Sequence, residues 1–153
     1  MAARKIRLTL SSDLLQNTGA IVDLDFAGDS LELDLAINET AGTGVAREYS
    51  VDLPNGTYDL VITYKNDEAR DMDLDGSLDG AHDQDRNLVI ENIEYSNDGV
   101  NYEQLDITTD VPDGAIGTYT GYELPDGSTL VEQYAYPLRM WQNGTATFDI
   151  FFS

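Results

Sequence analysis

The sequence predicts an all-β protein, an antiparallel β-sandwich of jelly-roll type, and two observations lead to that expectation. Apolar and polar residues alternate along most segments, which is the two-residue period of a strand with one buried face. Turn sequences rich in Pro, Asn, Asp and Gly separate these segments. Short alternating strands joined by such turns are typical of β-sandwiches.

The alternation runs through the chain in a series of separate segments. Within residues 31–37, for example, Leu31, Leu33, Leu35 and Ile37 would share one face of a strand. The expected strands cover residues 5–10, 20–26, 31–37, 48–53, 58–64, 88–95 and 145–152. The turn sequences between and around them lie at residues 53–57, 96–99, 111–114, 124–127 and 142–145.

The length and composition indicate one globular domain. A chain of 153 residues with 41% hydrophobic residues is large enough to bury a core, so residues 1–153 are expected to form a single β-sandwich domain. Residues 100–140 alternate less regularly, are richer in Tyr, and are expected to be a loop-rich portion. The absence of cysteine excludes disulfides and thiolate metal sites.

The charge of the chain restricts its partners. A formal net charge of -21 would repel the phosphates of nucleic acid and of anionic membranes, so neither is expected as a partner. Neutral glycans, divalent cations and other protein subunits remain. The first residues are not typical of a secretory signal, and no stretch has the length of a membrane span. An extracellular or virion-surface location is expected.

The connection between the strands at 58–64 and 88–95 is unusually acidic. Seven Asp and one Glu lie between Asp67 and Asp85, and they repel one another unless a cation or salt screens them. Within this connection Asp71, Asp73 and Asp75 alternate, Gly76 follows and Asp79 comes later, as in the first part of a calcium loop. The acid expected at the last position of such a loop is replaced by His82, and a solvated acidic loop is the alternative interpretation.

The residues that flank the acidic connection resemble the calcium-dependent xylan-binding carbohydrate-binding modules. A strand ends in Asn66-Asp67, an acidic loop follows, and Asp85-Arg86-Asn87-Leu88 opens the next strand. The resemblance covers roughly residues 46–95. It implies a β-sandwich in which a loop-held Ca²⁺ also binds two neighbouring sugar hydroxyls. The loop is longer here than the family pattern, which leaves room for a second, structural Ca²⁺.

The resemblance and the spacing together give a set of candidate metal ligands. The resemblance implies that Asp85 is a ligand of the sugar-binding ion, with Asp83 or Asp79 as a second ligand. It also implies that Arg86 and Asn87 brace the loop. Asp67 could take either role. The whole set of candidate metal ligands is Asp67, Asp71, Asp73, Asp75, Asp79, Asp83 and Asp85.

Aromatic residues are the candidates for contact with a sugar outside the metal. Tyr134, Tyr136 and Trp141 lie close together in the sequence, and their rings could stack on a pyranose. Tyr119 and Tyr122 are equally plausible platforms. A place in the core is the competing explanation, most of all for Trp141.

The function expected from these features is calcium-dependent, non-catalytic binding of a neutral polysaccharide or surface glycan. Catalysis is not expected, because the acids cluster in one loop and do not flank a scissile bond from separate strands. The alternative is a structural or decoration protein of a larger assembly such as a phage virion, with calcium stiffening its loops. A domain that binds calcium and no other ligand is a third possibility.

Overall fold

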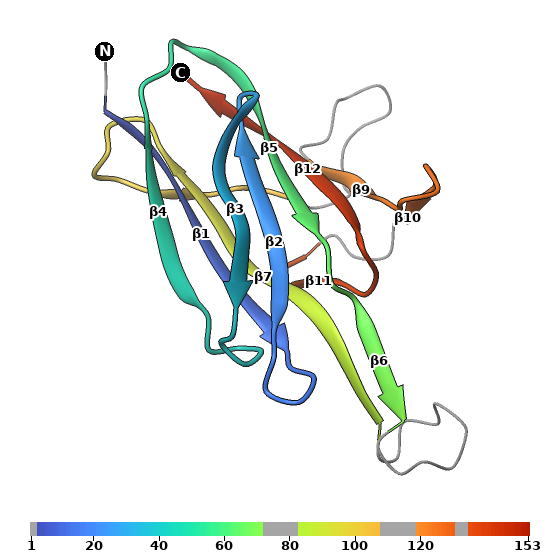
Figure 1. Cartoon of the computed structure of the whole chain (residues 1–153). Coiled ribbons are helices and arrows are strands. Elements are labelled where there is room, and N and C mark those ends of the chain that lie inside the picture. The colour runs from blue at the N-terminus through green and yellow to red at the C-terminus, as the bar shows by residue number, and fades with distance from the viewer. Residues whose placement is uncertain (1–2, 72–82, 108–118, 131–134) are drawn as a thin grey trace.

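The structure is a computed structural model that describes residues 3–71, 83–107, 119–130 and 135–153. Across these ranges the chain forms strands and no helix. The strands make two antiparallel sheets that enclose one apolar core (Figure 1). The predicted all-β sandwich is therefore confirmed. Within the same ranges there is no helix with the length and apolar character needed to cross a bilayer.

The first sheet is built around the long strand β7 and has the order β11-β7-β1-β4, with β6 and β8 also paired to β7. Its strands are β1 (Arg4–Asp13), β4 (Val45–Val51), β6 (Glu68–Asp71), β7 (Asp83–Ser96), β8 (Glu103–Gln104) and β11 (Leu138–Met140). Asp13, the last residue of β1, lies opposite Asn87 of β7. This pairing brings two polar residues together at the end of the sheet.

The second sheet has the order β10-β9-β12-β5-β2-β3. Its strands are β2 (Ala20–Phe26), β3 (Asp29–Ile37), β5 (Gly56–Tyr64), β9 (Tyr119–Glu123), β10 (Thr129–Leu130) and β12 (Gly144–Phe152). The long pairing of β12 with β5 runs from Gly144↔Tyr64 to Phe152↔Gly56. The ends of β5 and β12 that lie nearest β6 are therefore adjacent.

The core lies between the sheets and follows the alternation of the sequence. Buried residues recur at every second position of β2 and β12, as in the series Phe148, Ile150 and Phe152. Burying each such side chain contributes about 1.5–3 kcal/mol. Phe152 packs edge-on against Phe26, which ends β2 two strands away in the same sheet, with ring centroids 6.1 Å apart.

Strands β6 and β7 continue past the sandwich as a two-stranded ribbon. Their pairing runs from Glu68↔Arg86 to Asp71↔Asp83. Figure 1 shows the ribbon projecting at the end of the molecule away from both chain termini. The sequence predicted a loop over residues 66–87, so this prediction is wrong for both paired arms. Acidic residues have low strand propensity, and here the antiparallel backbone pairing overrides that propensity.

The region from 100 to 140 differs from the regular strands, as far as it is described. It contributes the short strands β8, β9, β10 and β11, which the sequence did not predict. Strands β8 and β11 pair with β7, β9 pairs with β12, and β10 pairs with β9 at the edge of the second sheet. A cis peptide bond joins Tyr136 to Pro137 just before β11.

Candidate functional site

The predicted site residues meet where the ribbon leaves the sandwich. Strand β5 ends at Tyr64, and residues 65–67 lead into β6. Strand β7 returns through Asp85, Arg86 and Asn87, with Asp85 opposite Ala69. The base of the ribbon therefore carries the two sequence signals, around Asn66-Asp67 and around Asp85-Arg86-Asn87, side by side.

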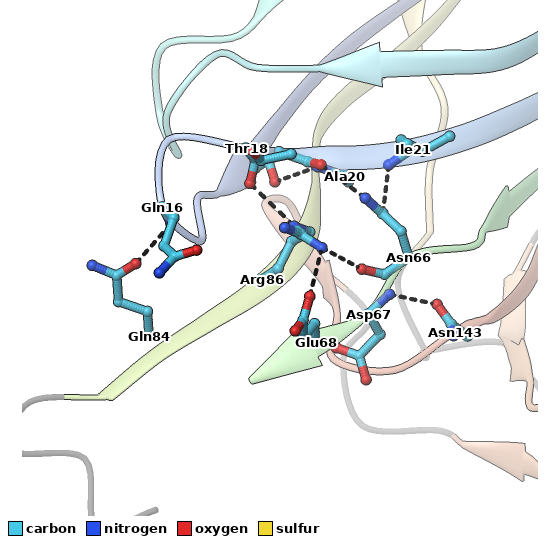
Figure 2. Close-up of polar contacts among 12 residues, drawn as sticks. Gln16, Thr18, Ala20, Ile21, Asn66, Asp67, Glu68, Gln84, Arg86 and Asn143 are labelled. Carbon is cyan, nitrogen blue, oxygen red and sulfur yellow. Dashed lines mark hydrogen bonds and ion pairs between the residues drawn. The ribbon is translucent and has the colours of Figure 1, made fainter. Parts of the chain in front are cut away.

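Arg86 holds this base together. Its Nε donates a hydrogen bond to the carbonyl of Thr18 at 3.1 Å, and its Nη1 donates to the carbonyl of Asn66 at 2.9 Å. Nη1 also lies 3.6 Å from the carboxylate of Glu68. Figure 2 shows the guanidinium between the β1–β2 turn and the start of β6. Arg86 is only 8% exposed, so these contacts lie largely away from water.

The segment between β5 and β6 is fixed on both sides. The side chain of Asn66 donates to the carbonyl of Gly19 at 3.1 Å and accepts from the amide of Ile21 at 2.6 Å. The amide of Asp67 donates to Oδ1 of Asn143 at 2.7 Å (Figure 2). Asn143 comes from the turn before β12, so Asp67 is positioned by a residue far away in the sequence.

Asp67 has an unusual environment for an acid. Its Oδ1 is buried and has no hydrogen-bond partner in the part of the chain that the structure describes. Burial raises the pKa of Asp67 above its ordinary value, and the negative charge of Asp85 raises it further. The positive charge of Arg86 and a backbone hydrogen bond from Glu68 lower the pKa but do not cancel these effects. A buried carboxylate oxygen beside a second carboxylate is an arrangement that a cation stabilises.

Asp85 belongs to a second group of polar contacts. Asn87 donates from Nδ2 to Asp85 at 3.3 Å and to Asp13 at 3.0 Å. Asp13 in turn accepts two hydrogen bonds from Arg139, from Nε at 2.7 Å and from Nη2 at 3.0 Å. Asn87 is 2% exposed, and its Oδ1 has no partner within the described ranges.

Three carboxylates act on the hydroxyl of Tyr64. This residue is 1% exposed, and its hydroxyl donates to the carbonyl of Arg86 at 2.6 Å. Burial raises the pKa of Tyr64, and the charges of Asp67, Asp85 and Asp13 raise it further, against the lowering effect of Arg86. The base of the ribbon therefore combines the acids of β1, β7 and the β5–β6 link around one tyrosine.

Of the remaining predicted metal ligands, only Asp71 and Asp83 lie within the described residues. They form the last described pair of the ribbon, and only their backbone is described. Asp73, Asp75 and Asp79 lie outside the described residues, as does His82. Among the side chains that the structure describes, no group of three His, Asp or Glu is arranged to hold a metal ion.

The predicted aromatic contacts fall in different places. Tyr134 lies outside the described residues. Tyr136 packs against the core, its hydroxyl donates to the carbonyl of Leu105 at 2.8 Å, and burial raises its pKa. Trp141 is 38% exposed, and the guanidinium of Arg139 lies 5.3 Å from its ring centroid. Trp141 thus contacts Arg139, which binds Asp13, and Asn87 links Asp13 to Asp85.

A groove opens beside Asp67, at the ends of β5, β9 and β12. It has a volume of about 290 Å³. Its lining residues are Thr63, Tyr64, Glu123, Leu124, Pro125, Asn143, Gly144 and Thr145. Asn143 therefore contacts the Asp67 amide and also lines the groove.

Sequence reasoning did not identify Asp13, Arg139 or Asn143. Asp13 lies three residues beyond the first predicted strand, and Asn143 lies in the sequence "QNGT", which by itself indicates only a turn. Arg139 and Asp13 are 126 positions apart, so only the folded chain brings them together.

Comparison with protein-family profiles, curated protein sequences and solved structures finds no significant match to this chain.

Proposed function

We propose that the chain binds calcium at the β6–β7 ribbon and, through that ion, a neutral polysaccharide or surface glycan, without catalysis. The observation that carries the proposal is the buried Oδ1 of Asp67, which has no hydrogen-bond partner among the described residues. The raised pKa of Asp67 beside Asp85 points the same way, because a bound cation would offset both the burial and the repulsion.

The donor atoms suit calcium more than a softer metal. Calcium prefers six to eight oxygen ligands in flexible geometry. Asp67 and Asp85 supply carboxylate oxygens at the base of the ribbon, and the sequence supplies further acids at 71, 73, 75, 79 and 83. The chain has no cysteine to ligate a softer ion. One or two Ca²⁺ ions fit this number of acids.

The glycan part of the proposal is supported by the surroundings of the ribbon base. A bound calcium with open coordination positions supplies attachment for two neighbouring sugar hydroxyls. Trp141 is partly exposed and lies against Arg139, which contacts Asp13, and a groove lies beside Asp67. The net charge of -21 favours a neutral glycan over an acidic one.

The proposal also includes jelly-roll connectivity and an extracellular or virion-surface location. The connectivity is supported by the repeated crossing of the chain between the sheets, from β1 to β2, from β3 to β4 and from β4 to β5. The location follows from the proposed ligand, since polysaccharides and surface glycans are met outside the cytoplasm.

Affinity electrophoresis on gels that contain single polysaccharides tests the function. The full chain should be retarded by at least one neutral polysaccharide with Ca²⁺ and should migrate freely with EDTA. Asp67→Asn should abolish the retardation, whereas Asp52→Asn, the same change in charge between β4 and β5, should not. Retardation that is equal in Ca²⁺ and EDTA would overturn the metal-mediated mechanism. Release of reducing sugar would overturn the absence of catalysis.

A structural role in a larger assembly, such as decoration of a phage virion, is the second candidate. It is favoured by the edge strands β3 and β4, where Leu33 is 68% exposed and Val45 is 57% exposed. A second groove of about 230 Å³ lies between these strands and includes Leu31 and Leu53. Apolar residues on open strand edges are typical of contacts with other chains.

Light scattering distinguishes the second candidate from the first. A subunit of an assembly should form oligomers as its concentration rises, and Leu33→Ser should reduce them. A glycan-binding module should remain monomeric and keep its polysaccharide retardation after the same substitution.

A further inference from the structure

The groove beside Asp67 has the composition of a binding site for a small polar ring. Thr63 and Thr145 face each other across β5 and β12, with their hydroxyl oxygens 3.4 Å apart. Glu123 lies opposite Thr145 on β9. Leu124 and Pro125 add an apolar part next to these polar groups. A pyranose ring presents the complementary surface, with hydroxyls at its edge and C–H groups on its faces.

The size of the groove limits what it can hold. Its volume of about 290 Å³ is close to the lower end, about 300 Å³, of the range for small-molecule pockets. It therefore suits one sugar ring and not several.

The charge near the groove selects against acidic sugars. Glu123 is exposed in the lining, and Asp67 lies just beyond Asn143. A carboxylate on the ligand would be repelled by both groups, since salt does not fully screen charges that lie within a Debye length. Uncharged rings avoid this repulsion.

Asn143 connects the groove with the ribbon base. Its Oδ1 accepts the amide hydrogen of Asp67 at 2.7 Å, and the same residue lines the groove. We propose that this groove is a subsite for one neutral pyranose ring, adjacent to the Asp67–Asp85 region. The proposal rests on the glycan-binding function and adds the place and the charge class of a second sugar contact.

One pair of substitutions tests the location. Thr145→Arg places a long cationic side chain opposite Glu123, where the two would pair across the groove and cover it. Thr147→Arg makes the same change two residues along β12, outside the lining, where the opposite residue on β5 is Val61. Titration of the ¹⁵N-labelled full chain with methyl β-D-xylopyranoside and methyl β-D-glucopyranoside, in Ca²⁺ and in EDTA, provides the readout.

The expected result is a set of shifts at the amides of Asn143, Gly144 and Thr145 with a neutral glycoside. Loss of the ring contacts should weaken binding about tenfold in Thr145→Arg, and Thr147→Arg should change it less than about twofold. Equal binding by both variants, or shifts confined to other residues, would overturn the subsite.

A charged ligand tests the selectivity. Methyl β-D-glucopyranosiduronic acid should bind about tenfold more weakly than the neutral glucoside, and Glu123→Gln should narrow this difference. Asp29→Asn on β3, at the opposite edge of the same sheet, serves as the control for net charge. Equal affinity for the uronate and the neutral glucoside would overturn the proposed selectivity for uncharged sugars.

The two proposals fail in different ways. Retardation by a polysaccharide in Ca²⁺ that survives Thr145→Arg would leave the proposed function intact and remove the groove from it. Glycoside shifts at the groove that are identical in Ca²⁺ and EDTA, without calcium-dependent retardation, would support the subsite and overturn the calcium-mediated function.

Discussion

Asp67 is the residue on which the calcium proposal depends most. Its buried Oδ1 lacks a hydrogen-bond partner within the described ranges, and its pKa is raised from the ordinary value of 3.8, first by burial and then by Asp85. The folded protein without metal therefore keeps this proton to a higher pH than the unfolded chain does. In that state stability is lost as the pH rises through the raised pKa.

Replacing Asp67 separates the effect of its carboxylate on stability without metal from its role in binding calcium. In EDTA at about pH 7, Asp67→Asn should be more stable than the parent by up to about 1 kcal/mol, after allowance for solvent screening. The gain should shrink as the pH falls through the raised pKa, because the parent carboxyl then takes up its proton. Urea unfolding across this pH range measures both effects.

The calcium response of the same variant provides the contrast. The parent should gain stability in Ca²⁺, and Asp67→Asn should gain much less. The control Asp52→Asn should respond like the parent. An Asp67→Asn variant that is destabilised in EDTA and stabilised by Ca²⁺ as strongly as the parent would show that Asp67 does not face the ion.

Asp59 and Asp149 are a pair of neighbouring acids that lies away from the ribbon. They lie directly opposite each other on β5 and β12. Burial raises the pKa of Asp149, and the hydrogen bond and charge of Asp59 raise it further. The protonated carboxyl of Asp149 therefore favours the folded state at low pH, and this contribution is lost as the pH rises through its raised pKa.

We expect Asp149→Asn to stabilise the protein at about pH 7 by roughly 0.5 kcal/mol, the scale of like charges on facing strand positions. High salt should reduce the gain, because these groups are partly exposed. Asp29→Asn, on the outer strand β3, is the matched control and should change stability less. Thermal unfolding at low and high salt measures the difference, and an equal effect of both substitutions would contradict the pair interaction.

At the scale of elements, the base of the ribbon depends on Arg86. A two-stranded ribbon alone is marginally stable in water, so β6 and the adjoining part of β7 need an anchor. Arg86 supplies it by donating to the carbonyls of Thr18 and Asn66 and by pairing with Glu68. These contacts join three segments at a position that is mostly buried.

Removing this anchor should destabilise the ribbon more than the sandwich. Arg86→Ala leaves two carbonyls unsatisfied and should lower the free energy of unfolding by about 2–4 kcal/mol. Arg86→Lys keeps the charge but not the planar fork, and should fall between the parent and Arg86→Ala. Hydrogen exchange should show the loss first at the amides of residues 66–71. Unchanged protection there would contradict the role of Arg86 as an anchor.

The sequence predicts the long strands well because their alternation reflects burial on one face. The expected strand at 20–26 agrees with β2, and that at 145–152 agrees with β12 to within one residue. The short strands β10 and β11 are too brief for alternation to be visible. The polar contacts of Asp13 with Arg139 and of Asp67 with Asn143 could not be predicted, because they join distant segments whose approach only the folded sheets determine.

At the scale of the whole molecule, charge is unevenly distributed along its length. Three of the eight basic residues, Arg4, Lys5 and Arg7, begin β1 at the end that carries the termini. The ribbon with its acidic sequence projects at the other end (Figure 1). With a net charge of -21, repulsion opposes the compact state, and cations gather where the acids are densest.

Because of this charge distribution, general screening by salt can be distinguished from specific binding of calcium. Added NaCl should stabilise the metal-free protein gradually, because it screens repulsion everywhere. Calcium at about a hundredfold excess over its Kd should add about 2.7 kcal/mol at the same ionic strength. For a chain of this size that gain corresponds to a rise in Tm of roughly 5–10 °C.

Differential scanning calorimetry in NaCl, MgCl₂ and CaCl₂ at matched ionic strength measures these effects. The parent should show the calcium increment above both other salts, since magnesium demands stricter geometry and gives up its water reluctantly. Asp67→Asn should keep the NaCl response and lose most of the calcium increment, because general screening does not need that carboxylate. Equal Tm values of the parent in all three salts would show that salt only screens the acids of the ribbon and that calcium does not bind there specifically. The exposed edges of β3 and β4 would then favour the structural role in an assembly.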